Sequence, residues 1–499
     1  MKKPKNKKQF KNSTFKDYNL SHISDLKNQS GKLVSGWNSI PNGKPVSWIE
    51  NAIPNYLWAI LLAGNLPREN TLHLFRSVFN RAATRHLTDS SITMLDLPNI
   101  NPDDKLYIFE EILKDPAAKR ILSALNFLSC LPDKVFWNTT FDTLSDDESI
   151  DILIKGVYVS LDHQSQESTD VRWLFLMYEI IAKQKMILTS EVADMLQNFL
   201  EYPNKGDMRS VRPMIRSAEM AFRAMNFEGN EKIRQFNIEF WKECFDRTPC
   251  LVPKPIIQNK INFQDLAVEA TDIYLNVVNN FKMNNSDFDV KREVVYGSIM
   301  YAFTIYLEII SYKNSFRIAG INLLRTLVEI YINLKYLTHK QDATLWEKFY
   351  KYGIGKCKQI LLKSIEKEDN ELPEYMNVEN LYNYASENGW IEMQDIDLGD
   401  WCKTNLRDRA IESGIKDFYD KHYDFLSAFS HGQWGALRQT VFTTCMNPLH
   451  KLHIVPKPAP AICVESVHIE ATKIMNLLLE LLNQNYSPFK PRFKKHNQT

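Results

Sequence analysis

Apolar residues recur along most of the chain with the three-to-four-residue spacing of an amphipathic helix. The spacing is clear in "DKLYIFEEILKDPAAKRILSALNFLSCL" and "VRWLFLMYEIIAKQKM", and again in "TKIMNLLLELLNQ" near the end of the chain. Strict alternation of apolar and polar residues is rare, and hairpin signals such as Asn-Gly between β-branched runs are nearly absent. The pattern therefore predicts an all-α protein.

The helical pattern is interrupted most strongly at "DRTPCLVPKPIIQNK", residues 246–260, where three prolines exclude a continuous helix. A chain of 499 residues is also too long for one hydrophobic core. We therefore expect two helical domains. The expected boundaries are a basic flexible tail over 1–35, an N-terminal helical domain over 36–248, a linker and connecting helix over 249–285, a C-terminal helical domain over 286–488 and a basic tail over 489–499.

One expected helix carries charge where its neighbours are apolar. The segment "RIAGINLLRTLVEIYINLKYL", residues 317–337, is apolar nearly all round, which indicates a helix buried on several sides. Arg325 and Glu329 lie four residues apart on it, so each can partly satisfy the other. Two interpretations stay open. The pair is a structural ion pair that fixes the helix, or it points into a cleft shared with another polar helix face.

A polar and aromatic stripe in residues 419–438 offers that second face. If this segment is one helix, seven side chains cover about one third of its circumference. They are Tyr419, Tyr423, Ser427, Ser430, His431, Trp434 and Arg438. A histidine in such a setting can act as an acid or base near neutral pH. The stripe is either a binding or catalytic site centred on His431 or a polar seam between packed helices. The sequence contains no GxSxG motif, so it does not support a serine hydrolase.

A run of arginines marks the N-terminal half. In "DMRSVRPMIRSAEMAFR", residues 207–223, Pro213 is expected to be the first residue of a helix. Arg209 and Arg212 would then precede the helix N-terminus, and Arg216 would follow one turn inside. Free backbone N–H groups and guanidinium groups together suit a phosphate or carboxylate. The alternative is that these arginines form salt bridges with a neighbouring acidic helix.

The formal net charge of +1 gives no overall field that would favour nucleic acid or a membrane, so a nucleic-acid site would have to be a local patch. The most apolar run near the start, "YLWAILLAG" at 56–64, is too short to span a bilayer. We expect no membrane partner and a cytoplasmic location.

Seven cysteines are dispersed, with no CxxC pair, which favours a reducing compartment over a disulfide framework. "CMNPLHKLH" holds Cys445, His450 and His453, with Cys463 and His468 further on. Their spacing matches no standard zinc pattern. We therefore predict neither a metal site nor a cofactor.

At these residues a family resemblance appears. The combination of "RTLVE" and "LKYL" on one helix with a later "Y…HY…S…SHG" helix resembles uncharacterised bacterial all-helical proteins whose C-terminal domain is similar to the HEPN superfamily (higher eukaryotes and prokaryotes nucleotide-binding). The resemblance covers about residues 290–440. HEPN domains are bundles of four or five helices, and many are dimeric RNA-cleaving toxins or antiviral effectors. Their signature is an Arg four to six residues before a His on one helix. Here no Arg precedes His431 at that spacing, and Arg325 would have to approach through space.

The resemblance implies an effector in bacterial defence or stress response that acts on RNA or a nucleotide. As a metal-independent ribonuclease, it would have a polar centre of His431, Arg325 and Glu329, in which His431 is the general base and Arg325 stabilises the charge that develops at phosphorus. Tyr423, Ser427, Ser430 and Arg438 would bind the substrate, and the protein would form homodimers. The alternative is a non-enzymatic helical scaffold that binds a partner protein and in which the same polar cluster holds helices together.

Overall fold

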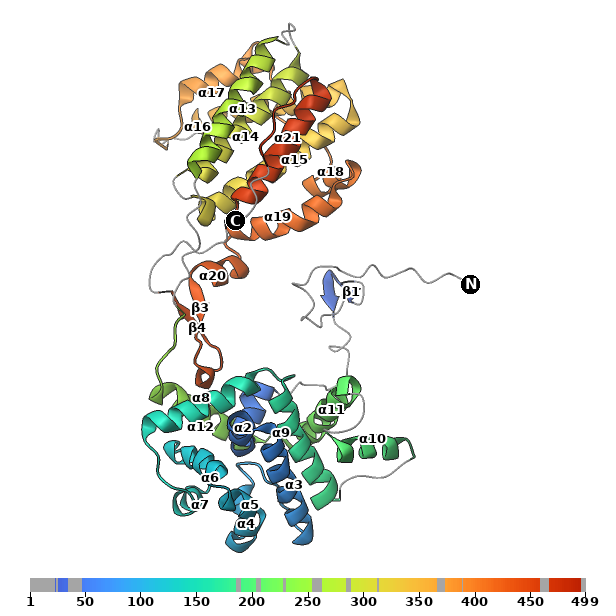
Figure 1. Ribbon diagram of the computed structural model, residues 1–499. Helices are drawn as coiled ribbons and strands as arrows, with labels where there is room; N and C mark the ends of the chain where they lie inside the picture. The colour runs from blue at the N-terminus through green and yellow to red at the C-terminus, as the bar shows by residue number, and fades with distance from the viewer. Residues whose placement is uncertain are drawn as a thin grey trace. The chain divides into compact units, whose positions relative to one another are not determined.

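The structure of the chain is a computed structural model. It describes residues 23, 26–34, 47–184, 190–202, 208–227, 230–253, 263–283, 289–311, 314–365, 373–387, 389–457 and 466–494. Parts of both predicted tails and of the predicted linker, and also Cys463, lie outside the described residues. The described residues form 21 α-helices and two short antiparallel hairpins, so the prediction of an all-α protein is confirmed (Figure 1).

The chain forms two compact units. Unit 1 comprises residues 1–251 together with the returning segment Cys445–His453, and unit 2 comprises residues 252–444 and 454–499. The predicted break at 246–260 spans the first boundary, but the return of nine residues near the C-terminus to the N-terminal unit was not predicted.

Unit 1 is built from twelve helices and one hairpin among its described residues. They are α1 (Ile53–Asn55), α2 (Leu57–Asn65), α3 (Arg68–Thr84), α4 (Pro102–Ile108), α5 (Glu110–Lys114), α6 (Pro116–Ser123), α7 (Lys134–Thr140), α8 (Asp146–Leu161), α9 (Gln166–Met177), α10 (Ser190–Glu201), α11 (Met208–Phe227), α12 (Glu231–Arg247), β1 (Lys27–Gln29) and β2 (Lys32–Val34).

Helix α2 is the centre of unit 1. Its residues 57–62 are all fully buried, as expected of a helix that is apolar on every side. It crosses α8 closely because glycines face each other at the contact. A Cβ atom added at Gly64 would lie only 2.6 Å from Cα of Gly156. Helix α8 begins with a Ser145 cap that accepts a hydrogen bond from the Glu148 N–H, and three acidic residues in its first turn favour the positive end of the helix dipole.

The end of α12 is fastened to a loop by one carboxylate. Glu243 accepts hydrogen bonds from the N–H groups of Ser129 and Cys130, at 2.7 and 2.8 Å, and from the Ser129 hydroxyl at 2.7 Å. Burial alone would raise the pKa of Glu243, but hydrogen bonds from the Cys130 thiol and from Ser129 outweigh burial and lower the pKa to about 2. Because the folded pKa lies below the value in the unfolded chain, the ionised carboxylate stabilises the fold.

This contact predicts a specific acid sensitivity. The stabilisation by Glu243 is fully present above pH of about 4.3 and is lost as the pH falls from there to about 2. We expect Glu243→Gln to lower the free energy of unfolding by about 1 kcal/mol at pH 7, a discounted value because water still reaches the group, and to flatten the pH dependence in that range. Urea unfolding at pH 7, 5 and 3 measures both. The exposed Glu239→Gln on the same helix is the control, and equal pH profiles of the two variants would contradict the assignment.

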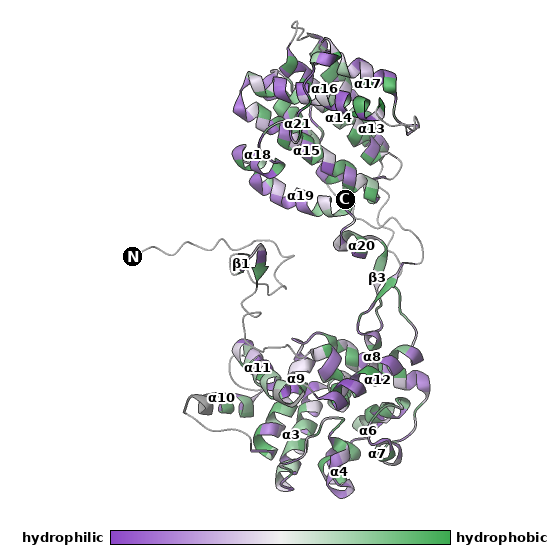
Figure 2. Cartoon of the chain, turned by 180° about the vertical axis from the view of Figure 1, so that it is seen from behind, coloured by the Kyte–Doolittle hydropathy of each residue, from purple (hydrophilic) through white to green (hydrophobic). Residues whose placement is uncertain are grey.

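Unit 2 contains nine helices and one hairpin among its described residues. They are α13 (Phe263–Met283), α14 (Val290–Ile310), α15 (Ile318–Lys340), α16 (Ala343–Ile365), α17 (Val378–Ala385), α18 (Leu406–Glu412), α19 (Lys416–Ser430), α20 (Trp434–Thr440), α21 (His468–Asn485), β3 (Phe442–Thr444) and β4 (Ile454–Pro456). Figure 2 shows hydrophilic and hydrophobic residues mixed around these helices, as their periodic sequences predicted.

Helix α14 forms the core of unit 2, where it packs against α13, α15, α16 and α21. Its aromatic residues Tyr296, Phe303 and Tyr306 are fully buried. By length and composition alone α14 could cross a membrane, and 56% of its apolar window is buried within the protein. Core helices of folded proteins give the same signal, so α14 by itself does not associate the chain with a membrane.

Candidate functional site

Helices α15 and α19 pack against each other in antiparallel orientation and carry five of the predicted site residues, namely Arg325, Glu329, Tyr423, Ser427 and Ser430. The Arg325 guanidinium donates a hydrogen bond to the Tyr423 hydroxyl at 2.8 Å and lies 3.0 Å from a Glu329 carboxylate oxygen. Further along the contact, the Ser430 hydroxyl donates to the Asn322 side-chain carbonyl at 3.0 Å. The structure therefore brings together Arg325, Glu329 and Tyr423, three of the residues predicted from the sequence.

This cluster is half-buried. The side chains of Arg325 and Glu329 are 24% and 34% exposed. Burial alone would lower the pKa of Arg325, but its hydrogen bond to Tyr423 and the charge of Glu329 raise the pKa above its usual value. Arg325 therefore stays protonated and serves as a fixed positive charge between the two helices.

The structure places His431 apart from this cluster. His431 follows the last residue of α19 and is exposed, eight residues beyond Tyr423, which corresponds to about 12 Å along a helix. The His431 N–H is bonded to the Ser427 carbonyl at 3.2 Å, and among the described residues its imidazole has no hydrogen bond to Arg325 or Glu329. The proposed catalytic residues are not assembled around one point.

The expectation of one helix through residue 438 is wrong, because α19 ends at Ser430. Gly432 adopts the left-handed conformation, with φ of +57°. The Gln433 N–H then bonds to the Ala428 carbonyl, and the Gly432 N–H bonds to the Phe429 carbonyl. This is the Schellman arrangement that closes a helix with glycine just past its end.

The residues beyond this break belong to the separate helix α20, so the helical wheel does not place them beside Tyr423. Trp434 is 61% exposed and its ring centre lies 5.9 Å from that of Phe442 in β3. Arg438 donates a hydrogen bond to the Thr444 hydroxyl. These two side chains hold α20 against β3.

The arginine cluster of unit 1 also differs from its prediction. Helix α11 begins at Met208, and Pro213 lies inside it and not at its first position. Helix formation on both sides of the proline is favoured because Val211 and Ile215, four residues apart, are both buried on one face. Arg209 and Arg212 are therefore helical residues and do not precede a free helix N-terminus.

Arg216 connects α11 to the neighbouring helix α9. Its guanidinium donates a hydrogen bond to the Thr169 hydroxyl of α9 at 3.2 Å. Burial lowers the pKa of Arg216, and the neighbouring positive charge of Arg212 lowers it further. Positive charge is thus concentrated on this face of α11, although the helix-terminus geometry that suggested an anion site is absent.

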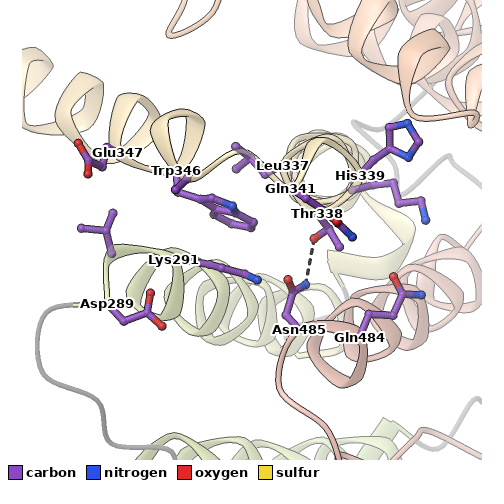
Figure 3. Close-up of a pocket in the computed structure, with 13 residues that line it drawn as sticks. Asp289, Lys291, Leu337, Thr338, His339, Gln341, Trp346, Glu347, Gln484 and Asn485 are labelled. Carbon is purple, nitrogen blue, oxygen red and sulfur yellow. Dashed lines mark hydrogen bonds between the residues drawn. The ribbon is translucent and has the colours of Figure 1, made fainter.

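A cavity that the sequence did not indicate lies at one end of unit 2. It has a volume of about 800 Å³ and is lined by the first turns of α14 and α16 and the last turns of α15 and α21. Figure 3 shows Lys291 of α14 and Trp346 of α16 extending into the same space between the helices. The side wall is fixed by a hydrogen bond from the Asn485 amide to the Thr338 hydroxyl, at 3.0 Å.

The carboxylates of this cavity have partners within the protein, whereas its two lysines form no ion pair among the described residues. Of its two carboxylates, Asp289 accepts a hydrogen bond from the Tyr486 hydroxyl at 2.9 Å, and Glu347 pairs with Lys351 at 3.2 Å. Lys291 and Lys335 form no ion pair among the described residues. The Lys291 ammonium instead lies 5.7 Å from the ring centre of Trp346. The cavity therefore offers two cations to a ligand while its carboxylates are engaged at the edge.

Unit 1 also contains a cluster of metal-ligating side chains. Cys250, Cys445, His450 and His453 place one sulfur or nitrogen atom each within 4.8 Å of one another. Cys250 is far from the other three residues in the sequence.

The fold and these sites define an all-helical protein of two units whose second unit contains the polar α15–α19 contact and the cavity. Residues 293–445, which include α15, α16 and α19, are similar to a family of unknown function (DUF5677). No curated protein and no solved structure matches the chain.

Proposed function

We propose that unit 2 is a HEPN-like helical domain that binds a nucleotide in the cavity at the ends of α14, α15, α16 and α21. The observation that carries this proposal is the pair Lys291 and Lys335, which form no ion pair within the part of the chain that the structure describes. Both line a cavity of about 800 Å³ whose two carboxylates are engaged elsewhere. That volume is within the usual range for small-molecule sites, which is about 300–1,000 Å³.

The residues that line the cavity suit both the phosphate groups and the base of a nucleotide. Lys291 and Lys335 would hold the phosphate groups, because charge-assisted contacts are the strongest hydrogen bonds available to phosphate oxygens. Trp346 is only 3% exposed, so its indole forms an apolar floor for the base and not a free stacking surface. The Gln341 side-chain amide can donate to and accept from the edge of a base. The Asn485 side chain can only accept there, through its carbonyl oxygen, because its NH2 group donates to Thr338 and to the Leu481 carbonyl.

We propose binding and not RNA cleavage at the α15–α19 contact. General acid–base catalysis needs the base within hydrogen-bond reach of the reacting group, or one water away. His431 lies beyond the end of α19, whereas Arg325 is bonded to Tyr423 two turns earlier. In this proposal the Arg325–Glu329–Tyr423 cluster holds the two helices together, and this is also the role that a non-enzymatic scaffold would give it.

The proposal predicts a loss of affinity when both lysines are neutralised. Two exposed charge-assisted contacts of about 1 kcal/mol each correspond to about 30-fold weaker binding in Lys291→Gln/Lys335→Gln. Binding of a fluorescent ATP analogue to the full chain, measured by anisotropy, tests this. The affinity of the wild-type chain should also fall with rising salt, because the contacts are ionic.

The matched control is Lys363→Gln/Lys403→Gln, which neutralises two exposed lysines of unit 2 outside the cavity. Equal loss in both double variants would show non-specific attraction and contradict the proposed site. Absence of binding by the wild-type chain to ATP and GTP analogues would favour the scaffold. RNA cleavage by the wild-type chain that is lost in His431→Ala would overturn the proposal in favour of a nuclease.

A further inference from the structure

Four side chains of unit 1 converge as the ligands of a zinc ion would. The Cys250 sulfur lies 3.5 Å from His450 Nδ1 and 3.4 Å from His453 Nε2, and the Cys445 sulfur lies 3.5 Å from His450 Nδ1. In a tetrahedral zinc site, bonds of about 2.3 Å to sulfur and 2.0–2.1 Å to nitrogen separate these donors by about 3.6 Å. We propose that Cys250, Cys445, His450 and His453 bind one Zn²⁺ ion.

The surroundings of His450 select the ring nitrogen that faces the proposed ion. His450 Nε2 lies 3.2 Å from the Thr248 carbonyl oxygen and 3.0 Å from the Thr248 hydroxyl. An N–H at Nε2 can donate to that carbonyl and leave the Nδ1 lone pair directed at the two sulfurs. Metal-bound histidines commonly use their other nitrogen in this way.

The surroundings of the Cys445 sulfur also favour metal binding. This sulfur is fully buried and accepts a hydrogen bond from the Leu251 N–H at 3.4 Å. Such a donor stabilises a thiolate, which is the form that binds metals. The Phe245 ring packs against His450 and His453, with ring centres 4.9 and 5.3 Å apart, and forms an apolar wall beside the ligands.

The backbone around the ligands is held by hydrogen bonds that do not depend on the ion. The amide of the fully buried Asn447 donates to the Thr248 hydroxyl at 3.0 Å and to the Pro249 carbonyl at 2.9 Å. The Cys445 N–H donates to the His453 carbonyl at 2.9 Å, which brings the two ends of the returning segment together. The four ligands are therefore positioned before a metal arrives.

The arrangement indicates a structural ion. Protein side chains supply all four positions of a tetrahedron, whereas catalytic zinc sites keep one position for water or substrate. Cys250 and His450 are 200 positions apart in the sequence, and both belong to unit 1. Zinc would therefore crosslink the end of the N-terminal segment to the returning segment and contribute its binding free energy to the folding of unit 1.

The test uses the full-length chain purified without a histidine tag. Mass spectrometry of metals should find about one zinc ion per wild-type chain and almost none in Cys250→Ser/Cys445→Ser. The control is Cys357→Ser, which removes a thiol of unit 2 outside the cluster and should keep the zinc. Removal of zinc by a chelator should lower the melting temperature of the wild-type chain and leave the double variant unchanged.

A second measurement does not depend on the folding of a variant. The metal-free wild-type chain titrated with Co²⁺ should give the visible absorption of a tetrahedral site and a near-ultraviolet band from sulfur-to-cobalt charge transfer, both saturating at one ion per chain. Octahedral cobalt spectra would overturn the proposal. A disulfide between Cys250 and Cys445, or free thiols in a wild-type chain without metal, would do the same. None of these outcomes bears on nucleotide binding by unit 2.

Discussion

Glu219→Ala is expected to lower the free energy of unfolding of unit 1 by about 3–5 kcal/mol, because it removes a buried carboxylate that pairs with two buried cations. Glu219 of α11 lies 2.9 Å from Arg223 and 3.4 Å from Arg172, and the three side chains are at most 4% exposed. It also accepts a hydrogen bond from the Tyr56 hydroxyl at 2.9 Å. Burial lowers the pKa of Arg172 to about 10, although the charge of Glu219 opposes this shift. Loss of the Glu219 carboxylate therefore makes the protonated form of Arg172 still less favourable in the folded chain.

Differential scanning calorimetry of the full chain measures this effect. For a unit of this size, such a loss corresponds to a melting transition lowered by about 6–20 °C. The control is Glu239→Ala on α12, which removes an exposed carboxylate and should change the stability by no more than about 0.5 kcal/mol. Similar melting temperatures for the two variants would contradict the prediction that Glu219 stabilises unit 1 through Arg172 and Arg223.

Gly320→Ala is expected to destabilise unit 2 by about 3 kcal/mol, through a clash that no side-chain rotation can relieve. A Cβ atom at residue 320 would lie 2.2 Å from the Asn314 carbonyl oxygen. That carbonyl also accepts the Arg317 N–H at 2.9 Å, just before α15 begins. Helix α15 could accept the methyl group only if the turn before it moved.

The same substitution at another helical glycine of unit 2 should have the opposite sign. A Cβ atom at Gly297 of α14 would meet nothing within 4 Å. Gly297→Ala should therefore stabilise the unit by about 0.4–1 kcal/mol, because alanine restricts the unfolded chain and favours the helix. Calorimetry of both variants measures the difference. Destabilisation of equal size in both would contradict the close approach at Gly320.

The secondary structure was predictable because its signal is local. Apolar spacing of three to four residues is a direct consequence of helix geometry, and it indicated both the all-α class and the buried helix that carries Arg325 and Glu329. The break after Ser430 was missed although its signal is also local. Gly432 stands at the position where a helix often ends with a left-handed glycine, whereas our prediction treated residues 419–438 as one continuous helix.

The sites were less predictable because they depend on contacts that are distant in the sequence. The cavity of unit 2 is assembled from the ends of four helices, and no stretch of sequence shows that Lys291 and Lys335 share it. The spacing from Cys445 to His453 matches no zinc pattern by itself. The fourth ligand, Cys250, becomes visible only when the returning segment is placed in unit 1. Our prediction of no metal site was based on the spacing of the residues from Cys445 onward, and Cys250 was not among the residues considered there.

The returning segment also sets the order in which the protein can be completed during synthesis. Leu449 of this segment is part of the hydrophobic core of unit 1, and the turn that contains it packs against α8 and α12. The ribosome adds about 5–20 residues per second, so the roughly 200 residues from Leu251 to His453 take about 10–40 s. Throughout that interval the nascent N-terminal helices expose the surface that Leu449 will cover. Unit 1 is therefore finished only after α13 to α20 of unit 2 have been made.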